Sequence, residues 1–487
     1  MGEHSTMTTE RRTEAFSASR RARTTGWPRF ASTSRRARTA RWLRFASTSG
    51  RPRTARWLRR APIFVAAGAI ALATGTMQAA ASSKEHVAAK HGPVSITLWE
   101  SHNGFPVGTT ISAMVARFDR THAGSVKVSI VVTKASTKLL AAIPAGTAPA
   151  LAEISHYDGQ YVSAGALIPW NNFIKGSSTI TKQNFTPAVW ENGTVNGQHY
   201  RLLANAKVSL VFYNETMFRK AGITSAPRTW TQLASDAAAI KAKDPGVIPL
   251  GWKDSSAHIL PAFMSDGGTL LKGSNSVGHA VDFTSPAAVR SFTYFRSLYS
   301  AGEMQIHHGT TLREDFGAGK MAMIDGTSAG YVKALTAVGG KFKVGAFVEP
   351  AGTTGHAANI AQGLGFVLPK GHTKAQDRAA ATFVEWWFQP SQQVFFAEHT
   401  GYPPETRAGV RAMPSSFLKT HPGEVATIQA ILSPYTVPRP ISDTYAEVQA
   451  ALDSAWYNAV TGRQSVKAAL QTLQKQGDGY MSGASQI

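Results

Sequence analysis

The feature that most limits how this chain can fold is an alternation of short strands and amphipathic helices that begins near residue 94. Strand-like stretches rich in β-branched residues are followed by stretches whose apolar residues recur at helical spacing. Strands are expected at Val94–Trp99, Val126–Val132 and Ala150–Ile154, and helices at Ile111–Phe118 and beginning at Leu139–Ile143. This order predicts an α/β fold with a mainly parallel sheet.

The carboxyl ends of these strands are where ligand chemistry is expected. In open α/β sheets, ligands bind in the crevice outside the carboxyl ends of the strands. Those ends fall at Glu100–Gly104, Lys134–Thr137 and His156–Gln160.

Length and cysteine content narrow the class of protein. A chain of 487 residues is too long for one ordinary core and predicts two or more domains, yet no Pro/Gly/Ser-rich linker divides it. The chain has no cysteine, which excludes disulfides, cysteine-bound metals, thiol catalysis and a lipid-bearing cysteine. Domains that are interleaved along the sequence explain both observations.

The positive charge is concentrated at the N-terminus. The chain carries a net charge of +22, and residues 1–60 hold 16 of its 51 Lys and Arg residues but 3 of its 29 Asp and Glu residues. A nucleic-acid-binding domain would spread its basic residues over a folded surface. We therefore expect a basic arm on a mildly basic globular body and no nucleic-acid partner.

The arm of residues 1–60 contains a repeat with a period of fifteen, with copies at Arg20–Ser34 and Arg35–Ser49 and a third that begins at Gly50 and runs to Arg60. The arm has too few apolar residues to bury a core, so we expect it to be disordered. One alternative is a basic arm that binds phosphates or anionic membranes. The other, which we favour, is a reading frame that extends upstream of the true start.

Residues 61–81 have the layout of a secretory signal peptide. Arg59 and Arg60 precede the apolar run Ile63–Ala73, and Ala79–Ala81 is a small-residue cleavage site. The apolar run is short for a membrane span, although an uncleaved anchor is an alternative. The body is therefore expected to be exported to the periplasm or the outer face of the cytoplasmic membrane, without a lipid anchor.

Several motifs in the body resemble those of family 1 extracellular solute-binding proteins of ABC importers. The most specific stretch is Phe212–Gly222 followed by Pro227–Leu233. Further matches are Ile96–Trp99 with Ser101 and Gly104, Ala145–Pro149, Phe316–Met323 and Thr461–Leu470, while His399–Pro404 is similar to the glycerol-3-phosphate-binding subgroup. The resemblance runs from about residue 94 to residue 475, with the motifs in order.

This resemblance implies a two-lobed periplasmic-binding-protein fold of type II with a central ligand cleft. The N-terminal lobe is expected to comprise residues 94–206 and 345–400, and the C-terminal lobe residues 207–344 and 401–487. Crossings are expected near Leu203–Val211, Val344–Pro350 and Thr400–Ala408. Binding would close the lobes by hinge motion, and a membrane permease would recognise the closed monomer.

The resemblance also suggests residues that contact a carbohydrate or polyol-type ligand. Trp252 and Tyr402 would present aromatic faces, and packing in a core is the alternative for Trp252. Gly363 would let backbone approach the ligand, or mark a strand bulge. Thr327 and Ser328 would supply hydroxyl groups, and His156 stands where the subgroup has a ligand-binding glutamate. In contrast, Trp386 and Trp387 lie in the apolar helix Ala379–Phe388 and are expected in the core.

Two cations would decide the charge of the ligand. Arg439 approximates the arginine that grips phosphate in the relatives, and Lys207 precedes the Tyr213–Asn214 motif. A buried phosphate needs such partners. If both cations point inward, we expect an anionic ligand such as a glycerophosphodiester; if both point to solvent, we expect a neutral sugar. Because many ligand positions differ from the glycerol-3-phosphate subgroup, a neutral sugar is the default expectation.

An enzyme is the competing class. Gly326–Gly330 satisfies the G-x-S-x-G pattern of hydrolases, a short and weak signal that also requires a strand–turn–helix setting and a downstream acid and histidine. His307 and His308 with Glu303 are a weak metal signal, because adjacent loop histidines do not face one ion. No P-loop or dinucleotide motif is present, so the ATPase would be a separate chain. We expect no catalysis and no cofactor.

Overall fold

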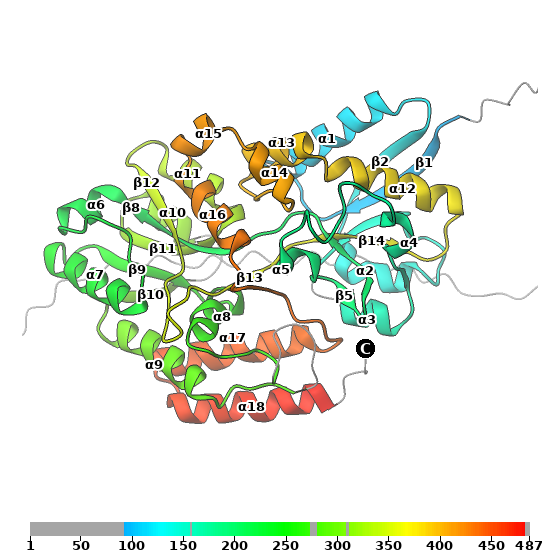
Figure 1. Cartoon of the computed structure of the whole chain (residues 1–487). Helices are drawn as coiled ribbons and strands as arrows, with labels where there is room; N and C mark the ends of the chain where they lie inside the picture. The colour runs from blue at the N-terminus through cyan, green and yellow to red at the C-terminus, as the bar shows by residue number, and fades with distance from the viewer. Residues whose placement is uncertain (1–91, 156–157, 273–279, 308–310, 483–487) are drawn as a thin grey trace, which may run out of the picture. The chain divides into compact units, whose positions relative to one another are not determined.

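The computed structural model describes residues 92–155, 158–272, 280–307 and 311–482, which build two β-sheets covered by helices. Figure 1 shows the strands of the two sheets as separate groups, with β13 between them. The basic arm, the signal-like segment and His156 lie outside the described residues. No helix in the described ranges is long and apolar enough to cross a membrane.

The first sheet has the strand order β2-β1-β3-β14-β4, and β7 also pairs with β14. Strands β1, β2 and β3 are parallel, as predicted, whereas β14 runs antiparallel to β3, β4 and β7. The strands of this sheet are β1 (Val94–Glu100), β2 (Val126–Val132), β3 (Leu151–Ile154), β4 (Leu167–Ile168), β7 (Leu202–Leu203) and β14 (Gly365–Pro369).

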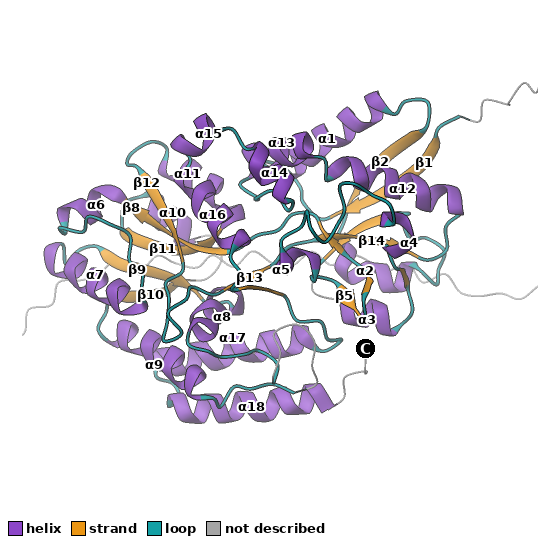
Figure 2. Ribbon diagram, in the orientation of Figure 1, coloured by secondary structure: helices purple, strands orange, loops and turns teal. Residues whose placement is uncertain are grey.

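Eight helices belong with this first half in the described ranges, and Figure 2 shows them around its strands. Thr373 and Gln376 form a capping box that starts α12, and its residues Trp386 and Trp387 are buried in the core as predicted. The helices are α1 (Val107–Thr121), α2 (Ala135–Ala142), α3 (Asp158–Ser163), α4 (Asn171–Ile174), α5 (Pro187–Trp190), α12 (Lys374–Trp387), α13 (Pro390–Thr400) and α14 (Arg407–Ala412).

The second sheet has the strand order β10-β9-β11-β8-β12. Strands β9, β10 and β11 are parallel, and β8 runs antiparallel to both β11 and β12. Its strands are β8 (Ser209–Asn214), β9 (Ile248–Lys253), β10 (Met304–His307), β11 (Met321–Thr327) and β12 (Val344–Val348). The helices and the 3-10 turn of this half are α6 (Glu215–Lys220), α7 (Trp230–Lys243), α8 (Ser256–Ser265), α9 (Pro286–Ser300), α10 (Thr311–Gly317), η1 (Ser328–Gly330), α11 (Tyr331–Val338), α15 (Ser415–Thr420), α16 (Pro422–Leu432), α17 (Tyr445–Thr461) and α18 (Val466–Ser482).

The Phe212–Gly222 motif has a structural explanation. Its apolar residues complete β8, and the Asn214 side chain then accepts hydrogen bonds from the backbone N–H groups of Thr216 and Met217. An asparagine in this position caps the helix N-terminus. The motif therefore turns a buried strand directly into helix α6.

Two of the backbone segments through which the chain passes between the sheets pair with each other. Residues 204–208 lead from β7 to β8, and residues 349–364 lead from β12 to β14 by way of β13 (Asn359–Ala361), which pairs with β15 (Thr436–Pro438). The Lys207 N–H donates to the Gln362 carbonyl at 2.6 Å, and the Gln362 N–H donates back at 2.9 Å. A small sheet of β5 (Thr194–Val195) and β6 (Gln198–His199) completes the strands.

Three predicted boundaries shift in the structure. Strand β12 pairs with β8, so residues 345–348 belong to the second sheet rather than to the first lobe. Helix α14 packs against α13 of the first half, which moves the third crossing beyond Thr400–Ala408. Helix α2 runs from Ala135 to Ala142, whereas the sequence predicted a helix that begins at Leu139. The buried face of the helix already starts at Ala135.

Gly363 lies where the paired crossing segments approach most closely. It has a φ of +146°, and a Cβ built on it would lie 2.1 Å from the Asn205 carbonyl oxygen. No side chain fits without displacing this backbone.

Gly363→Ala is therefore expected to lower the free energy of unfolding by more than ~2 kcal/mol, measured by urea denaturation. The matched control is Gly355→Ala, where φ is +77° but no atom lies within 4 Å of the added Cβ. The control should cost only ~1 kcal/mol. Equal losses in the two variants would contradict the close approach.

Candidate functional site

Asn205, Ala206 and Lys207, in the segment that leads from β7 to β8, lie between two groups of charged side chains. Asn205 Nδ2 donates to Glu153 Oε1 at 3.3 Å, and the Ala206 N–H donates to Glu405 Oε1 at 2.8 Å. The backbone of Lys207 pairs with Gln362, whose Oε1 accepts from Arg439 Nη2 at 2.6 Å. An acidic group and a basic pair thus lie on either end of this three-residue stretch.

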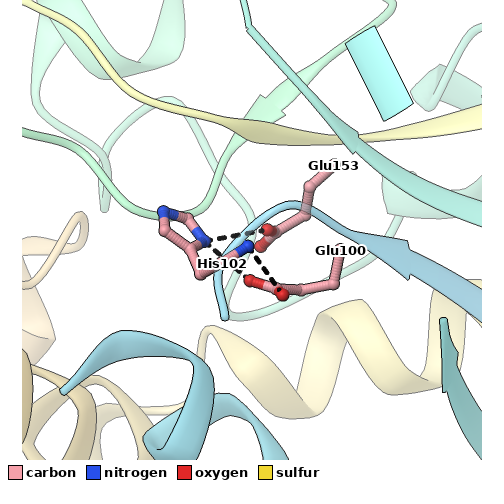
Figure 3. A group of neighbouring side chains, drawn as sticks. All are labelled: Glu100, His102 and Glu153. Atoms are coloured by element: carbon pink, nitrogen blue, oxygen red, sulfur yellow. Dashed lines mark hydrogen bonds and ion pairs between the residues drawn. The ribbon is translucent and has the colours of Figure 1, made fainter. Parts of the chain in front are cut away.

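The acidic group consists of Glu100, His102, Glu153 and Glu405. Glu100 ends β1, His102 follows it, and Glu153 lies near the end of β3, so three members occupy the predicted ligand edge of the first sheet. His102 Nδ1 lies 2.6 Å from Glu100 Oε1 and 3.7 Å from Glu153 Oε2. Figure 3 shows these side chains pointing toward one another. All three glutamates are almost completely buried.

Burial and mutual contact change the protonation of this group. Burial lowers the pKa of His102, but the hydrogen bond to Glu100 and the interactions with both Glu100 and Glu153 outweigh burial and raise the pKa to about 9. Burial raises the pKa of Glu153 and brings that of Glu405 to about 8. The site therefore holds protons that the same side chains would release in water.

Tyr402 lies beside the acidic group. Its ring meets the His102 ring edge-on at a centroid distance of 6.4 Å and stacks on Phe396 at 5.6 Å. Burial raises the pKa of the Tyr402 phenol, and Glu153 and Glu100 add to this effect. The structure therefore places Tyr402 next to His102, at the ligand edge of the first sheet.

The basic pair, Lys207 and Arg439, also faces inward. Arg439 is 8% exposed, and Lys207 is half-buried. Burial, and after it the charges of Arg439, Lys253 and Lys333, lower the pKa of Lys207 to about 8. Lys207 Nζ has no hydrogen-bond or ion-pair partner among the described residues. A negative charge close to Lys207 Nζ would stabilise the protonated side chain.

Polar side chains also lie at the carboxyl ends of the second sheet. His258 Nδ1 is 2.9 Å from Asp325 Oδ2, and the Lys253 N–H donates to Asp325 Oδ1 at 2.9 Å. Glu349 is fully buried after β12, and burial together with the charge of Asp325 raises its pKa well above the usual value.

The Trp252 ring does not face the ligand edge of the second sheet, contrary to the prediction of a cleft tryptophan. It is 0% exposed and packs against Trp230 and Phe295, at centroid distances of 6.2 and 4.9 Å. Because side chains on a strand alternate between faces, β9 directs Trp252 into the aromatic core under α7 and α9.

The remaining predicted residues have structural partners. Ser328 is buried; its N–H donates to the Val208 carbonyl and its Oγ accepts from the Val208 N–H at 3.3 Å. Thr327 pairs with Ser209 in the sheet. Gly363 contacts the Asn205 backbone, which explains the glycine without a ligand.

These contacts also bear on the motifs that suggested enzymes. Ser328, the serine of the G-x-S-x-G pattern, is not the exposed nucleophile that a hydrolase elbow requires, because its hydroxyl is buried against Val208. His307 lies 3.9 Å from Asp315, and its neighbour His308 lies outside the described residues.

Sequence reasoning missed the acidic group as a whole. One signal was available, because Glu153 interrupts the apolar strand Leu151–Ile154 and a buried carboxylate requires a partner. Glu100 and His102 fall within the predicted ligand edge Glu100–Gly104, but Glu405 comes from a distant segment and no local pattern indicates that it joins them.

Glu405→Gln should weaken the pH dependence of stability. The folded protein holds the Glu405 proton up to a pKa of about 8, whereas the unfolded chain releases it near 4.5. The proton on Glu405 therefore stabilises the folded wild type at low pH, and this stabilisation is lost as pH rises from 4.5 to 8. Glutamine keeps the acceptor for Ala206 but does not titrate.

Urea denaturation at pH 5, 7 and 9 measures the effect. We expect the variant to exceed the wild type by more than ~1 kcal/mol at pH 9 and to match it most closely at pH 5. Glu447→Gln, which changes an exposed glutamate on α17, should leave the profile unchanged. Parallel profiles for the wild type and Glu405→Gln would contradict the assignment.

Comparison with known proteins agrees with this architecture. The sequence profile of the bacterial extracellular solute-binding proteins matches residues 113–427. The chain is 22% identical over 414 residues to the sn-glycerol-3-phosphate-binding periplasmic protein UgpB of Pectobacterium atrosepticum, covering 79% of this chain and 91% of that protein.

Two solved structures show the same fold. The cyclic alpha-maltosyl-1,6-maltose binding protein from Arthrobacter globiformis has a TM-score of 0.68 at 22% identity, and UgpB from Mycobacterium tuberculosis in complex with glycerophosphocholine has 0.68 at 17%. Each match covers 80% of this chain and 99% of the other. The two sheets linked by paired crossings are thus a two-lobed binding-protein fold, and the chain belongs to the bacterial extracellular solute-binding protein family.

Proposed function

We propose that this solute-binding protein captures a polyol-type molecule that carries an anionic group and delivers it to the permease of an ABC importer. The observation that carries the proposal is the inward orientation of Lys207 and Arg439. Two inward-facing cations are expected for an anionic solute, and two solvent-facing cations for a neutral sugar. The buried Arg439 and the half-buried Lys207 therefore favour an anionic solute.

The positive charges around Lys207 favour an anion next to this side chain. After burial, the positive charges of Arg439, Lys253 and Lys333 lower the pKa of Lys207, so these cations lie close enough to repel its charged form. A phosphate or carboxylate would pair with Lys207 Nζ in a charge-assisted hydrogen bond, which is stronger than a neutral one. Such a pair would also offset the cost of holding Lys207 away from water.

The polar groups around the cations suit a polyhydroxylated body. The acidic group, Tyr402 and the Asp325–His258 pair offer donors and acceptors at the carboxyl ends of both sheets. Relatives are named for sn-glycerol 3-phosphate and glycerophosphocholine, and another for a cyclic maltosyl-maltose. Among these chemistries, those bearing a phosphate match the basic pair.

The remaining features of the role are part of the same proposal. The signal-like residues 61–81 would export the body, which would act as a monomer outside the cytoplasm without a lipid-bearing cysteine. A separate ATPase would drive transport, because the chain lacks a P-loop. Solute binding itself requires no catalytic step, and the proposal assigns none.

A ligand panel with charge variants tests the proposal. Thermal shift and calorimetry with sn-glycerol 3-phosphate, glycerophosphocholine, glycerol and maltose should show stabilisation by the phosphate compounds. Lys207→Gln should weaken their binding by about tenfold to a hundredfold, the range set by one hydrogen bond to a charged group. Arg439→Ala should weaken it as well.

The matched control is Lys220→Gln, which removes an exposed lysine of α6 and should leave the dissociation constant unchanged. Tight maltose binding that survives both Lys207→Gln and Arg439→Ala within a few-fold would instead establish a neutral-sugar protein. Unfolding of each variant in the absence of ligand separates loss of binding from loss of structure.

A further inference from the structure

Glu100, His102 and Glu153 are oriented as metal ligands are. One oxygen of each carboxylate is held by a neutral donor: the His102 N–H donates to Glu100 Oε2 at 2.8 Å, and Asn205 Nδ2 donates to Glu153 Oε1 at 3.3 Å. The other oxygen of each carboxylate faces His102 Nδ1 (Figure 3). Supporting hydrogen bonds of this kind orient the residues that bind metals.

Glu153 Oε2 provides an independent sign that something is held here. Glu153 is 0% exposed, and its Oε2 is buried without accepting a hydrogen bond. A buried carboxylate oxygen without a hydrogen bond is costly, and here it points into a group that already contains a second buried carboxylate. A cation located between the three side chains would remove this cost.

We propose that Glu100, His102 and Glu153 bind a divalent cation of the Zn²⁺ class. One imidazole nitrogen with two carboxylate oxygens suits Zn²⁺ and neighbouring first-row ions, whereas Ca²⁺ and Mg²⁺ prefer oxygen alone. The three ligand atoms lie within 4.8 Å of one another. Zinc–ligand bonds of ~2.0–2.2 Å place tetrahedral ligands ~3.4 Å apart, so small side-chain movements complete the site.

The position of the group leaves a role for such an ion. His102 is partly exposed at 19%, and the group lies at the ligand edge of the first sheet beside Tyr402. Three protein ligands leave a fourth position for water or for a donor atom of a solute. The inference does not depend on which solute is bound, because the three protein ligands are present without it.

A competition titration with the full, tag-free chain tests the site. Metal-stripped protein is titrated with Zn²⁺ against a chromophoric chelator, and one equivalent should bind with a dissociation constant below ~10 µM. Glu153→Gln and His102→Gln should each weaken binding by about a hundredfold, since even supporting residues contribute ten- to a hundredfold. His399→Gln, an exposed histidine on α13, is the matched control and should bind as the wild type does.

A spectroscopic measurement on the wild type covers the case in which a variant fails to fold. Co²⁺ should give visible absorption bands of a low-coordinate nitrogen–oxygen site, and one equivalent of Zn²⁺ should abolish them. A spectrum of aqueous Co²⁺ alone, or equal Zn²⁺ affinity in His102→Gln and His399→Gln, would overturn the proposal. His102 would then be the internal cation of the group, carrying a proton between the two carboxylates.

Discussion

The reciprocal backbone pairing of Lys207 with Gln362 is the contact on which the arrangement of the two sheets depends. These residues lie in two of the segments that carry the chain from one sheet to the other, and their two hydrogen bonds hold these segments side by side. Gly363 permits the approach, and the Asn205 side chain accepts from the Leu364 N–H. Glu153, Glu405 and Arg439 of the candidate site are hydrogen-bonded to Asn205, Ala206 and Gln362 of these segments.

Acidic and basic side chains lie at different residues of the segment that contains Lys207. The side chain of Asn205 and the backbone of Ala206 bind the acidic group, whereas Lys207 lies with Arg439 on the basic side. Burying charged groups is unfavourable unless they are paired or change protonation, and the raised pKa of Glu405 and lowered pKa of Lys207 are both consequences of burial. A folded protein retains such costs most readily where a ligand or ion later offsets them.

The sequence predicted the architecture better than the site. Strand β2 has the predicted bounds, and β1 and β3 differ by one residue, because alternation and β-branched content report local backbone preference directly. Trp252 was misplaced because a strand pattern does not show which face of the sheet meets the ligand. Glu100 and Glu153 are brought together by the parallel pairing of β1 with β3, and Glu405 joins them through its hydrogen bond to the crossing segment, so their proximity is a property of the fold. Lys207 and Arg439 were identified from the resemblance, and only the structure shows that both face inward.

The central claim is that two lobes joined by the paired crossing segments close on a solute. Small-angle scattering of the purified protein, alone and saturated with the phosphate compound that stabilises it most, tests this claim most directly. Hinge closure between lobes predicts a smaller radius of gyration in the saturated sample. An unchanged radius at full saturation, confirmed by calorimetry on the same sample, would contradict the account.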